Sequence, residues 1–161
     1  MNTPSVVWQW HDWQSLGRDA LYALLELRQK VFVLEQTCLY PDIDGLDPEA
    51  WHLLGWSTDP QNPGLVACLR LLFPGGKQAK PAIGRVVVQP DWRNRGLGKQ
   101  LLDQAVEFGR QHFPDTALHL SAQSHLQQFY TAFGFVAVSD EYDEDGIPHI
   151  DMRREAVSGE R

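Results

Sequence analysis

The chain has 161 residues, 43% of them hydrophobic, and a formal net charge of -7. This length suits one domain with a substantial core, so we expect a single domain over residues 1–161. The acidic balance argues against general affinity for nucleic acid or anionic membranes. No stretch approaches the ~20 apolar residues of a membrane span. The first residues lack the features of a secretion signal, and the two cysteines, Cys38 and Cys68, are isolated, which favours a cytoplasmic protein with free thiols and no metal site.

The first half of the chain is rich in predicted strands. Apolar alternation and β-branched runs predict the strands, leucines at three- and four-residue intervals predict the helix, and Pro/Gly/Asp clusters predict the turns. Ser15 is the expected helix cap. In chain order we expect a strand over 6–10, a helix from about Arg18 to Leu34, a loop over 40–50, a hairpin of strands 52–57 and 65–73, a turn over 74–81 and a strand over 82–88.

The second half alternates strands and helices. Leu97, Leu101, Ala105 and Phe108 share one face of a predicted helix that runs from Gly96 to His112. After it we expect a strand over 117–122, a helix over 125–133 closed by Gly134, a strand over 135–139, an acidic turn over 140–146, a last strand over 147–153 and a frayed tail over 155–161. The order indicates a mixed α/β protein.

The segment "RNRGLGKQLL", residues 93–102, gathers cations and glycines at the start of the long helix. The first turn of a helix has N–H groups without intrahelical partners, and its macrodipole is positive there, so the place suits a phosphate. Gly96 and Gly98 let an anion approach the backbone, and Arg93, Arg95 and Lys99 add full charges. An ordinary turn with solvated charges is the alternative interpretation.

Two common phosphate loops do not match this segment. The dinucleotide fingerprint needs a third glycine where Leu101 stands, and a P-loop needs Ser or Thr where Gln100 follows Lys99. Arg93-x-x-Gly96-x-Gly98 instead resembles the R/Q-x-x-G-x-G/A signature of the GNAT acyltransferase superfamily. "FYTAFGFVAV", residues 129–138, resembles the F-Y-x-x-x-G-F segment of the same superfamily, and residues 27–52 resemble its ElaA-like branch.

The resemblance implies the GNAT fold, an α+β architecture with a central, mixed, mostly antiparallel, twisted sheet of about six or seven strands flanked by helices. It implies an acyltransferase that moves acetyl from acetyl-CoA to a primary amine by direct attack, without an acyl-enzyme and without a metal. The strand before the loop would splay from its neighbour and bond the pantetheine arm, and the loop would hold the pyrophosphate. The implied coenzyme A-binding residues are Val86, Val87, Val88, Arg93, Asn94, Arg95, Gly96, Leu97, Gly98, Lys99 and Tyr130.

Tyr130 is the candidate acid, because a phenol is protonated at neutral pH and can donate to a departing thiolate. It also falls in an apolar stripe, so a plain core role is the alternative. The strand over 82–88 lacks the Glu or His base of many relatives. Glu35, His52 and His149 are the alternative bases, each of which is also consistent with an ordinary structural residue, and a water chain without any single base is a further option.

Two acidic segments suggest an acceptor class. Carboxylates at Asp42, Asp44, Asp47 and Glu49, and five more within 140–145, would attract a cationic amine acceptor, either a small molecule or a peptide. Solvated surface is the alternative interpretation. A homodimer stays open as the assembly. The competing functions are a coenzyme A-binding module that has lost catalysis and an enzyme similar to acyl-homoserine-lactone synthases.

Overall fold

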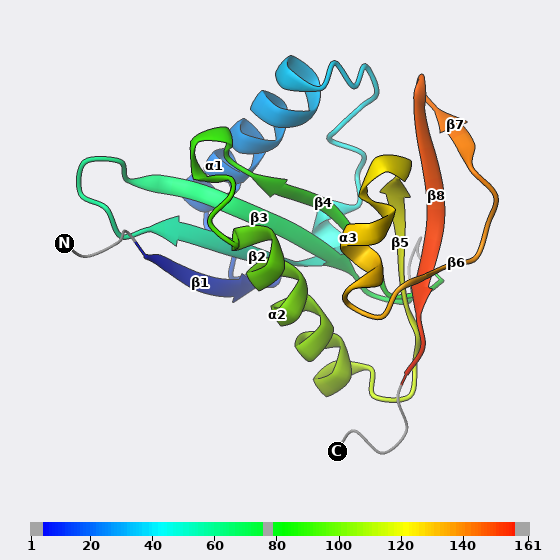
Figure 1. Ribbon diagram of the computed structural model, residues 1–161. Coiled ribbons are helices and arrows are strands. Elements are labelled where there is room, and N and C mark those ends of the chain that lie inside the picture. Colours follow the sequence, from blue (N-terminus) through cyan, green and yellow to red (C-terminus); the bar gives the residue numbers. More distant parts are fainter. Residues whose placement is uncertain (1–4, 76–78, 157–161) are drawn as a thin grey trace. The chain divides into compact units, whose positions relative to one another are not determined.

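Figure 1 shows the computed structural model of the chain, which describes residues 5–75 and 79–156. The chain forms two compact units. The first contains the residues up to Arg70 and the segment Arg85–Leu101, and the second contains Leu71–Gly84 and the residues from Leu102 onward. Strand β3 (Gly64–Leu72), strand β4 (Ala82–Val88) and helix α2 (Leu97–His112) contribute residues to both units. The single domain over 1–161 stays a prediction.

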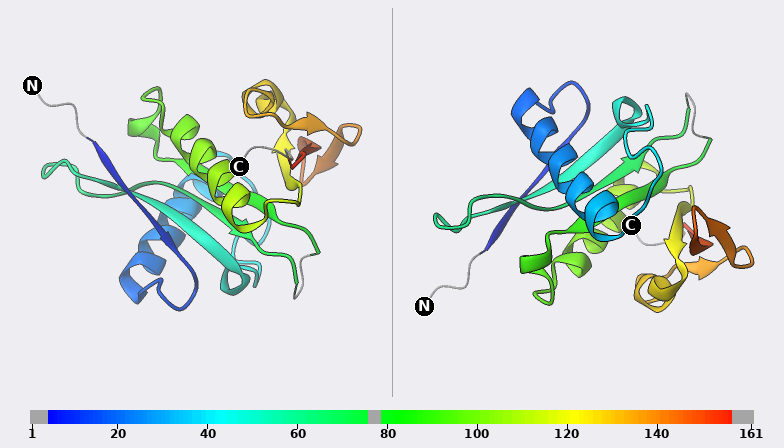
Figure 2. Two further views of the ribbon diagram at one scale, coloured as in Figure 1. Left: turned by 90° about the horizontal axis from the view of Figure 1, so that it is seen from below. Right: turned by 90° about the horizontal axis from the view of Figure 1, so that it is seen from above.

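In the first unit the strand order is β1 (Val6–His11), β2 (Ala50–Ser57), β3 and β4. Strands β1 and β2 are antiparallel, with Val6 opposite Ser57 and His11 opposite His52. Helix α1 (Arg18–Arg28) continues as a π-helix, η1 (Gln29–Glu35). Figure 2 shows α1 on one face of these strands and the first turn of α2 on the other. Leucines of α1 and β2 fill the core beneath α1: Leu24, Leu27, Leu53 and Leu54 are at most 4% exposed.

Strand β1 is tied to the start of α2 by Trp8. Its ring lies over Gly55, where an added Cβ would stand 2.6 Å from a ring atom, so β2 needs a glycine at this position. Its indole Nε1 donates to Gln100 Oε1 at 3.0 Å. This contact fixes the first turn of α2 against the strands of the first unit.

In the second unit, β5 (Leu118–Gln123) pairs in parallel with the beginning of β4 and antiparallel with β8 (Ile147–Arg154). Two short strands, β6 (Val136–Ala137) and β7 (Tyr142–Glu144), also pair antiparallel with β8. The short helix α3 (Gln127–Thr131) follows the 3₁₀ turn η4 (Ser124–Leu126) and packs on β5 and β6. The expected apolar face of α2 is confirmed, because Leu101 and Ala105 are fully buried and Phe108 is 7% exposed.

Within residues 5–75 and 79–156 the strands form an eight-stranded, mostly antiparallel sheet flanked by helices, which confirms the predicted mixed α/β class. The additional strand is β7, in a segment where a turn was expected. It forms because Asp145 and Gly146, with φ of 52° and 85°, reverse the chain tightly and lay Tyr142–Glu144 beside β8.

The helix predicted from about Arg18 to Leu34 has the expected extent, and its part after Arg28 is a π-helix. Two further local predictions were wrong. The cap of α1 is Gly17, without a side-chain hydrogen bond, while Ser15 is engaged with Asp12 and His11. The strand predicted over 135–139 is reduced to Val136–Ala137. The predicted turn over 74–81 and the frayed tail lie partly outside the described residues. No helix in the described part of the chain is long and apolar enough to cross a membrane.

Candidate active site

The register between β4 and β5 covers only the first residues of β4. It consists of Ala82 opposite His119 and Ile83 opposite Leu120. Two residues later Arg85 has φ 52°, a left-handed conformation that a non-glycine residue rarely adopts. The Val86–Val88 segment follows, and beyond it Gln89 N donates to Val66 O at 2.8 Å, which ties the end of β4 to β3. The expected splay of this strand from its neighbour stays a prediction.

A buried tryptophan anchors the loop after β4. The 3₁₀ turn η3 (Pro90–Trp92) is capped by Gln89, whose side-chain oxygen accepts from Asp91 N at 2.7 Å. Trp92 is 5% exposed, and the Arg95 guanidinium lies 4.7 Å from the centre of its ring. The buried Trp92 ring therefore supports the Arg95 guanidinium through a cation–π contact.

Two left-handed residues then lead the chain into α2. Asn94 has φ 64° and Gly96 has φ 79°, which explains the residue types at both positions. Helix α2 begins at Leu97 and extends over 16 residues, so its first turn presents backbone N–H groups and the positive end of a long helix. Gly98 and Lys99 lie in this turn. The arrangement is chemically suited to a phosphate or pyrophosphate group.

The structure brings together two residues that the sequence separates by 58 positions, Arg93 and Glu35. The two guanidinium Nη atoms donate to the two carboxylate oxygens at 2.6 and 3.0 Å, and Arg93 Nε donates to Val88 O at 3.2 Å. Arg93 therefore connects the loop to η1 through Glu35 and to β4 through Val88. Glu35, expected as a candidate base, is held in a bidentate pair that proton acceptance would have to break.

A cavity of about 260 Å³ lies beside the same loop, against the turn between β2 and β3. The carboxylates of Asp59 and Asp91 are among its lining groups, together with Gln89 and Arg95. Negative charge in the lining disfavours a phosphate there. The start of α2 is therefore the better anion site of the two.

Tyr130 lies in α3 within an aromatic cluster of the second unit. It is 7% exposed and makes edge-to-face contacts with Phe129 and Phe135, at ring-centre distances of 5.1 and 6.4 Å. Burial raises the pKa of Tyr130 to about 12. The phenol therefore keeps its proton throughout the neutral range and is available as a hydrogen-bond donor.

His52 is fully buried in β2. Its Nε2 lies 3.0 Å from Asp47 O and so carries the proton that it donates to that carbonyl. Burial lowers the pKa of His52, against the opposing effect of Asp47. A neutral imidazole in the core is suited to a structural role and has no exposed atom with which to meet an acceptor.

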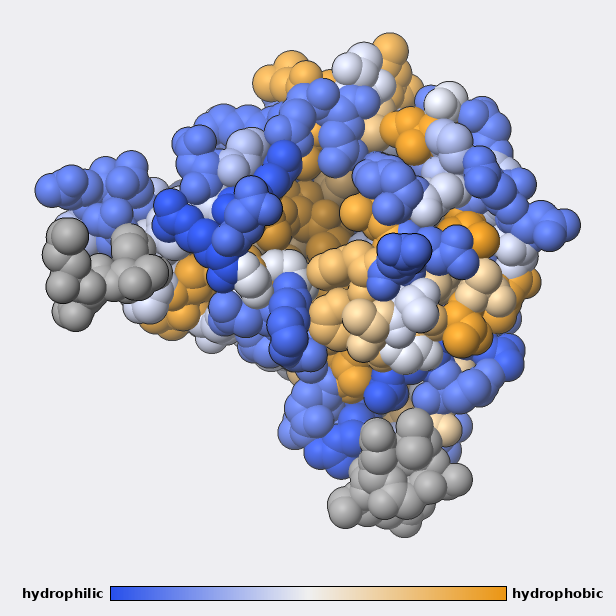
Figure 3. All heavy atoms as spheres, in the orientation of Figure 1, coloured by the Kyte–Doolittle hydropathy of each residue, from blue (hydrophilic) through white to orange (hydrophobic). Residues whose placement is uncertain are grey.

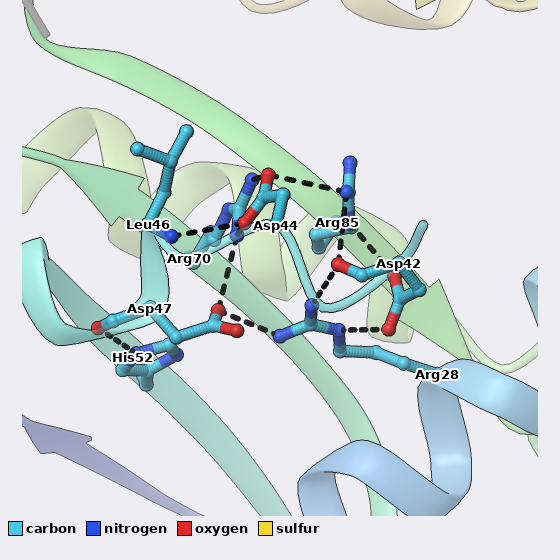
Figure 4. Close-up of polar contacts among 8 residues, drawn as sticks. All are labelled: Arg28, Asp42, Asp44, Leu46, Asp47, His52, Arg70 and Arg85. Atoms are coloured by element: carbon cyan, nitrogen blue, oxygen red, sulfur yellow. Dashed lines mark hydrogen bonds and ion pairs between the residues drawn. The ribbon is translucent and has the colours of Figure 1, made fainter. Parts of the chain in front are cut away.

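Asp47 belongs to a ring of ion pairs, the largest polar feature that sequence reasoning missed (Figure 4). Arg28, at the end of α1, contacts Asp42 at 3.0 Å and Asp47 at 2.7 Å. Arg70 of β3 contacts Asp47 at 3.1 Å and Asp44 at 2.6 Å. Arg85 of β4 closes the ring with Asp44 at 3.3 Å and Asp42 at 2.8 Å. Each carboxylate thus has two guanidinium partners, and each guanidinium has two carboxylate partners.

The ring overturns both interpretations of the first acidic segment. The side chains of Asp42 and Asp47 are 10% and 6% exposed, so they are not solvated surface. Three arginines balance the three aspartates, so the ring carries no excess negative charge for a cationic acceptor. A signal existed in the sequence: Arg28, Arg70 and Arg85 each stand in an apolar stretch, where a buried cation requires a carboxylate partner.

The same segment turns apolar side chains outward. Leu34, Leu39 and Ile43 are 68%, 78% and 65% exposed. Figure 3 shows hydrophobic side chains at the top of the view, over the segment that follows α1. The carboxylates of Asp42 and Asp47 are thus buried in the ring, while these three aliphatic side chains, from η1 and the loop after it, face the solvent.

His149, the third candidate base, lies in β8 of the second unit. Its Nδ1 is 2.8 Å from Ile147 O, and its ring stacks on Tyr142 at 6.2 Å. With the proton on Nδ1, the other ring nitrogen Nε2 faces Glu144 at 3.4 Å and has a lone pair when the ring is neutral. Among the three candidates, His149 has the geometry of a proton acceptor.

The remaining candidates are simpler. The carboxylates within 140–145 are exposed, as expected of a solvated acidic turn. Cys38 and Cys68 are buried free thiols, and burial raises the pKa of Cys68 to about 12, which makes it a poor nucleophile. No group of metal-ligating side chains occurs among the residues that the structure describes.

Comparisons with known proteins agree with this arrangement. The sequence model of the family described as "Acetyltransferase (GNAT) domain" matches residues 75–156. The protein ElaA of Escherichia coli is 44% identical over 94% of this chain and 98% of its own length, and its crystal structure superposes with a TM-score of 0.85 over 93% of this chain and 99% of ElaA. An acyl-CoA N-acyltransferase from Pseudomonas aeruginosa is 45% identical, with a TM-score of 0.85 over 93% of this chain and 99% of that one. A coenzyme A-dependent acyl-homoserine lactone synthase, BjaI, shares the fold with a TM-score of 0.73 at 17% identity, over 96% of this chain and 85% of BjaI.

Proposed function

Because the chain belongs to the GNAT family of N-acetyltransferases, which use acyl-CoA donors, we propose that it moves acetyl from acetyl-CoA to a primary amine. The amine attacks the thioester directly in a ternary complex. The observation that carries the proposal is the succession, along the chain, of the Val86–Val88 segment, a loop anchored by Trp92 and the exposed start of α2. Its backbone N–H groups would receive the pyrophosphate, and Arg95 and Lys99 would add charge.

Val86–Val88 would bond the pantetheine arm, and an N–H of this segment would stabilise the oxyanion. Arg93 holds the loop in place through Glu35 and Val88, and any direct contact with phosphate would come in addition to that role. Asn94, Gly96, Leu97 and Gly98 shape the loop around the diphosphate.

The test is calorimetric titration of the protein with acetyl-CoA and with coenzyme A, followed by a free-thiol assay with a panel of amines. We expect saturable binding of both ligands and thiol release that depends on an amine. Absence of binding would overturn the proposal. Binding without release for any amine would support a coenzyme A-binding module, a reading favoured by the lack of a carboxylate or imidazole on β4.

Tyr130 would donate a hydrogen bond to the departing sulfur. A phenol with a pKa near 12 is a weaker acid than a thiol, whose pKa is ~8.5, so it stabilises the thiolate without giving up its proton. Tyr130→Phe should lower kcat about 10²-fold while the Kd for acetyl-CoA changes little. Steady-state kinetics and calorimetry measure the two quantities, and an unchanged kcat would remove Tyr130 from the mechanism.

His149 would accept the proton of the incoming amine, directly or through water. His149→Ala should lower kcat/KM about 10²-fold, because the imidazole that would accept the proton is gone. His125→Ala, at an exposed histidine in η4, is the matched control and should retain the wild-type kcat/KM. If kcat/KM is unchanged in His149→Ala, proton removal takes place without this imidazole.

The exposed carboxylates within 140–145 are the remaining basis for preferring a cationic acceptor. Since such attraction is screened by salt, the KM for a cationic amine should rise with ionic strength. A KM that does not respond to salt would argue against this preference.

A further inference from the structure

Arg85, next to the proposed donor site, combines a left-handed backbone with several side-chain contacts. Arg85 has φ 52°, a left-handed backbone conformation that is disfavoured for every residue that carries a Cβ. Such a conformation persists only where the surroundings hold it. The residue lies between the end of the β4–β5 register, at Ile83, and the Val86–Val88 segment.

Contacts from a single loop hold the Arg85 side chain. Its Nε lies 2.8 Å from Asp42 Oδ1, and its Nη2 donates to Asp42 O at 3.1 Å and to Asp44 Oδ2 at 3.3 Å. The guanidinium also lies 5.3 Å from the centre of the Tyr40 ring. Figure 4 shows Asp42 and Asp44 beside Arg85, and Arg28 and Arg70, from α1 and β3, hold the same two aspartates.

We propose that Arg85 is a positioning residue for the acyl donor: the ring of ion pairs holds its left-handed backbone, and that backbone positions the Val86–Val88 segment for the pantetheine arm. The inference rests on the proposed function. It assigns to the aspartate loop a role in the donor site, because Asp42 and Asp44 act on the donor only through Arg85.

Two substitutions at the same position separate backbone from side chain. Arg85→Gly removes the tether but leaves the left-handed conformation accessible, whereas Arg85→Ala removes the tether and disfavours that conformation. We expect the Gly variant to bind acetyl-CoA a few-fold more weakly than the wild type, and the Ala variant about tenfold more weakly than the Gly variant. Calorimetry gives the Kd values, and thermal unfolding confirms that both variants are folded.

Asp145 provides the matched control, because it has the same φ of 52° in the turn between β7 and β8. Asp145→Gly and Asp145→Ala should differ in stability and yet bind acetyl-CoA equally. If Arg85→Gly and Arg85→Ala also bind acetyl-CoA equally, Arg85 is merely structural and the inference is overturned.

If Arg85→Ala does not fold, Asp44→Asn decides the question. This variant removes the charge from one of the two carboxylates that hold Arg85, and the Kd for acetyl-CoA should rise a few-fold. An unchanged Kd would overturn the inference. Wild-type protein that binds no acetyl-CoA would instead contradict the proposed function, which makes the two failures distinguishable.

Discussion

The two acidic segments, 42–49 and 140–145, have similar compositions and opposite environments. In the first, Asp42, Asp44 and Asp47 belong to the ring, and each carboxylate is held by two guanidinium groups. In the second, the residues that carry the carboxylates are exposed, and Glu144, whose side chain is 52% exposed, lies 3.4 Å from His149 Nε2. The difference comes from cations that lie elsewhere in the chain. A run of carboxylates therefore becomes a structural core or a solvated surface according to partners that are remote in sequence.

The largest expected effect comes from removing a central cation of the ring. Arg28→Met would leave Asp42 and Asp47 buried beside an uncharged side chain, and breaking a buried pair in this way typically costs 3–5 kcal/mol. Urea unfolding measures the loss in the free energy of unfolding. A loss under about 1 kcal/mol would show that the ring behaves like surface ion pairs.

A smaller effect, specific to acid, should follow from Asp44→Asn. Burial acts to raise the pKa of Asp44, but hydrogen bonds from Arg70 and Leu46 outweigh it, and the pKa lies well below the ordinary 3.8; that of Asp47 is also lowered. The two carboxylates therefore contribute to the free energy of unfolding at pH values above their ordinary pKa. This contribution is lost as the pH falls through the lower pKa values that they have in the folded protein. The wild type should lose stability progressively below about pH 4, and Asp44→Asn should show a shallower loss. Urea unfolding between pH 7 and about pH 2 measures both slopes, and parallel curves would contradict the prediction.

The smallest effect is expected in the solvated segment. Glu141→Gln removes an exposed carboxylate, so the free energy of unfolding should change by less than about 0.5 kcal/mol. The free energy of unfolding of Glu141→Gln should depend on pH in the same way as that of the wild type. A larger change would mean that the second segment also takes part in a network, and the contrast between the two segments would lose its basis.

Much of the fold and of the donor loop could be predicted because the signals are local. The β-branched run before Pro90 fixed the bounds of β4 correctly, and the apolar face of α2 was read from the spacing of its leucines. The glycine of the loop was recognised as well: Gly96 has the left-handed φ that its residue type suggests.

The rest depends on contacts between distant residues. The partners in the ring stand 14 to 43 positions apart, and Glu35 and Arg93 stand 58 apart, so no short window of sequence contains them. Strand β7 is visible only through its pairing with β8. The role of His52 depends on its complete burial, which an imidazole in a half-apolar strand does not reveal.

The ring also limits which parts of this chain can be exchanged. A designer who moves the 36–49 loop of this chain onto another scaffold transplants three carboxylates whose counterions stay behind on α1, β3 and β4. The loop would be accommodated only if the recipient also had arginines at the positions equivalent to Arg28, Arg70 and Arg85, so the loop and these three residues have to be exchanged as one unit.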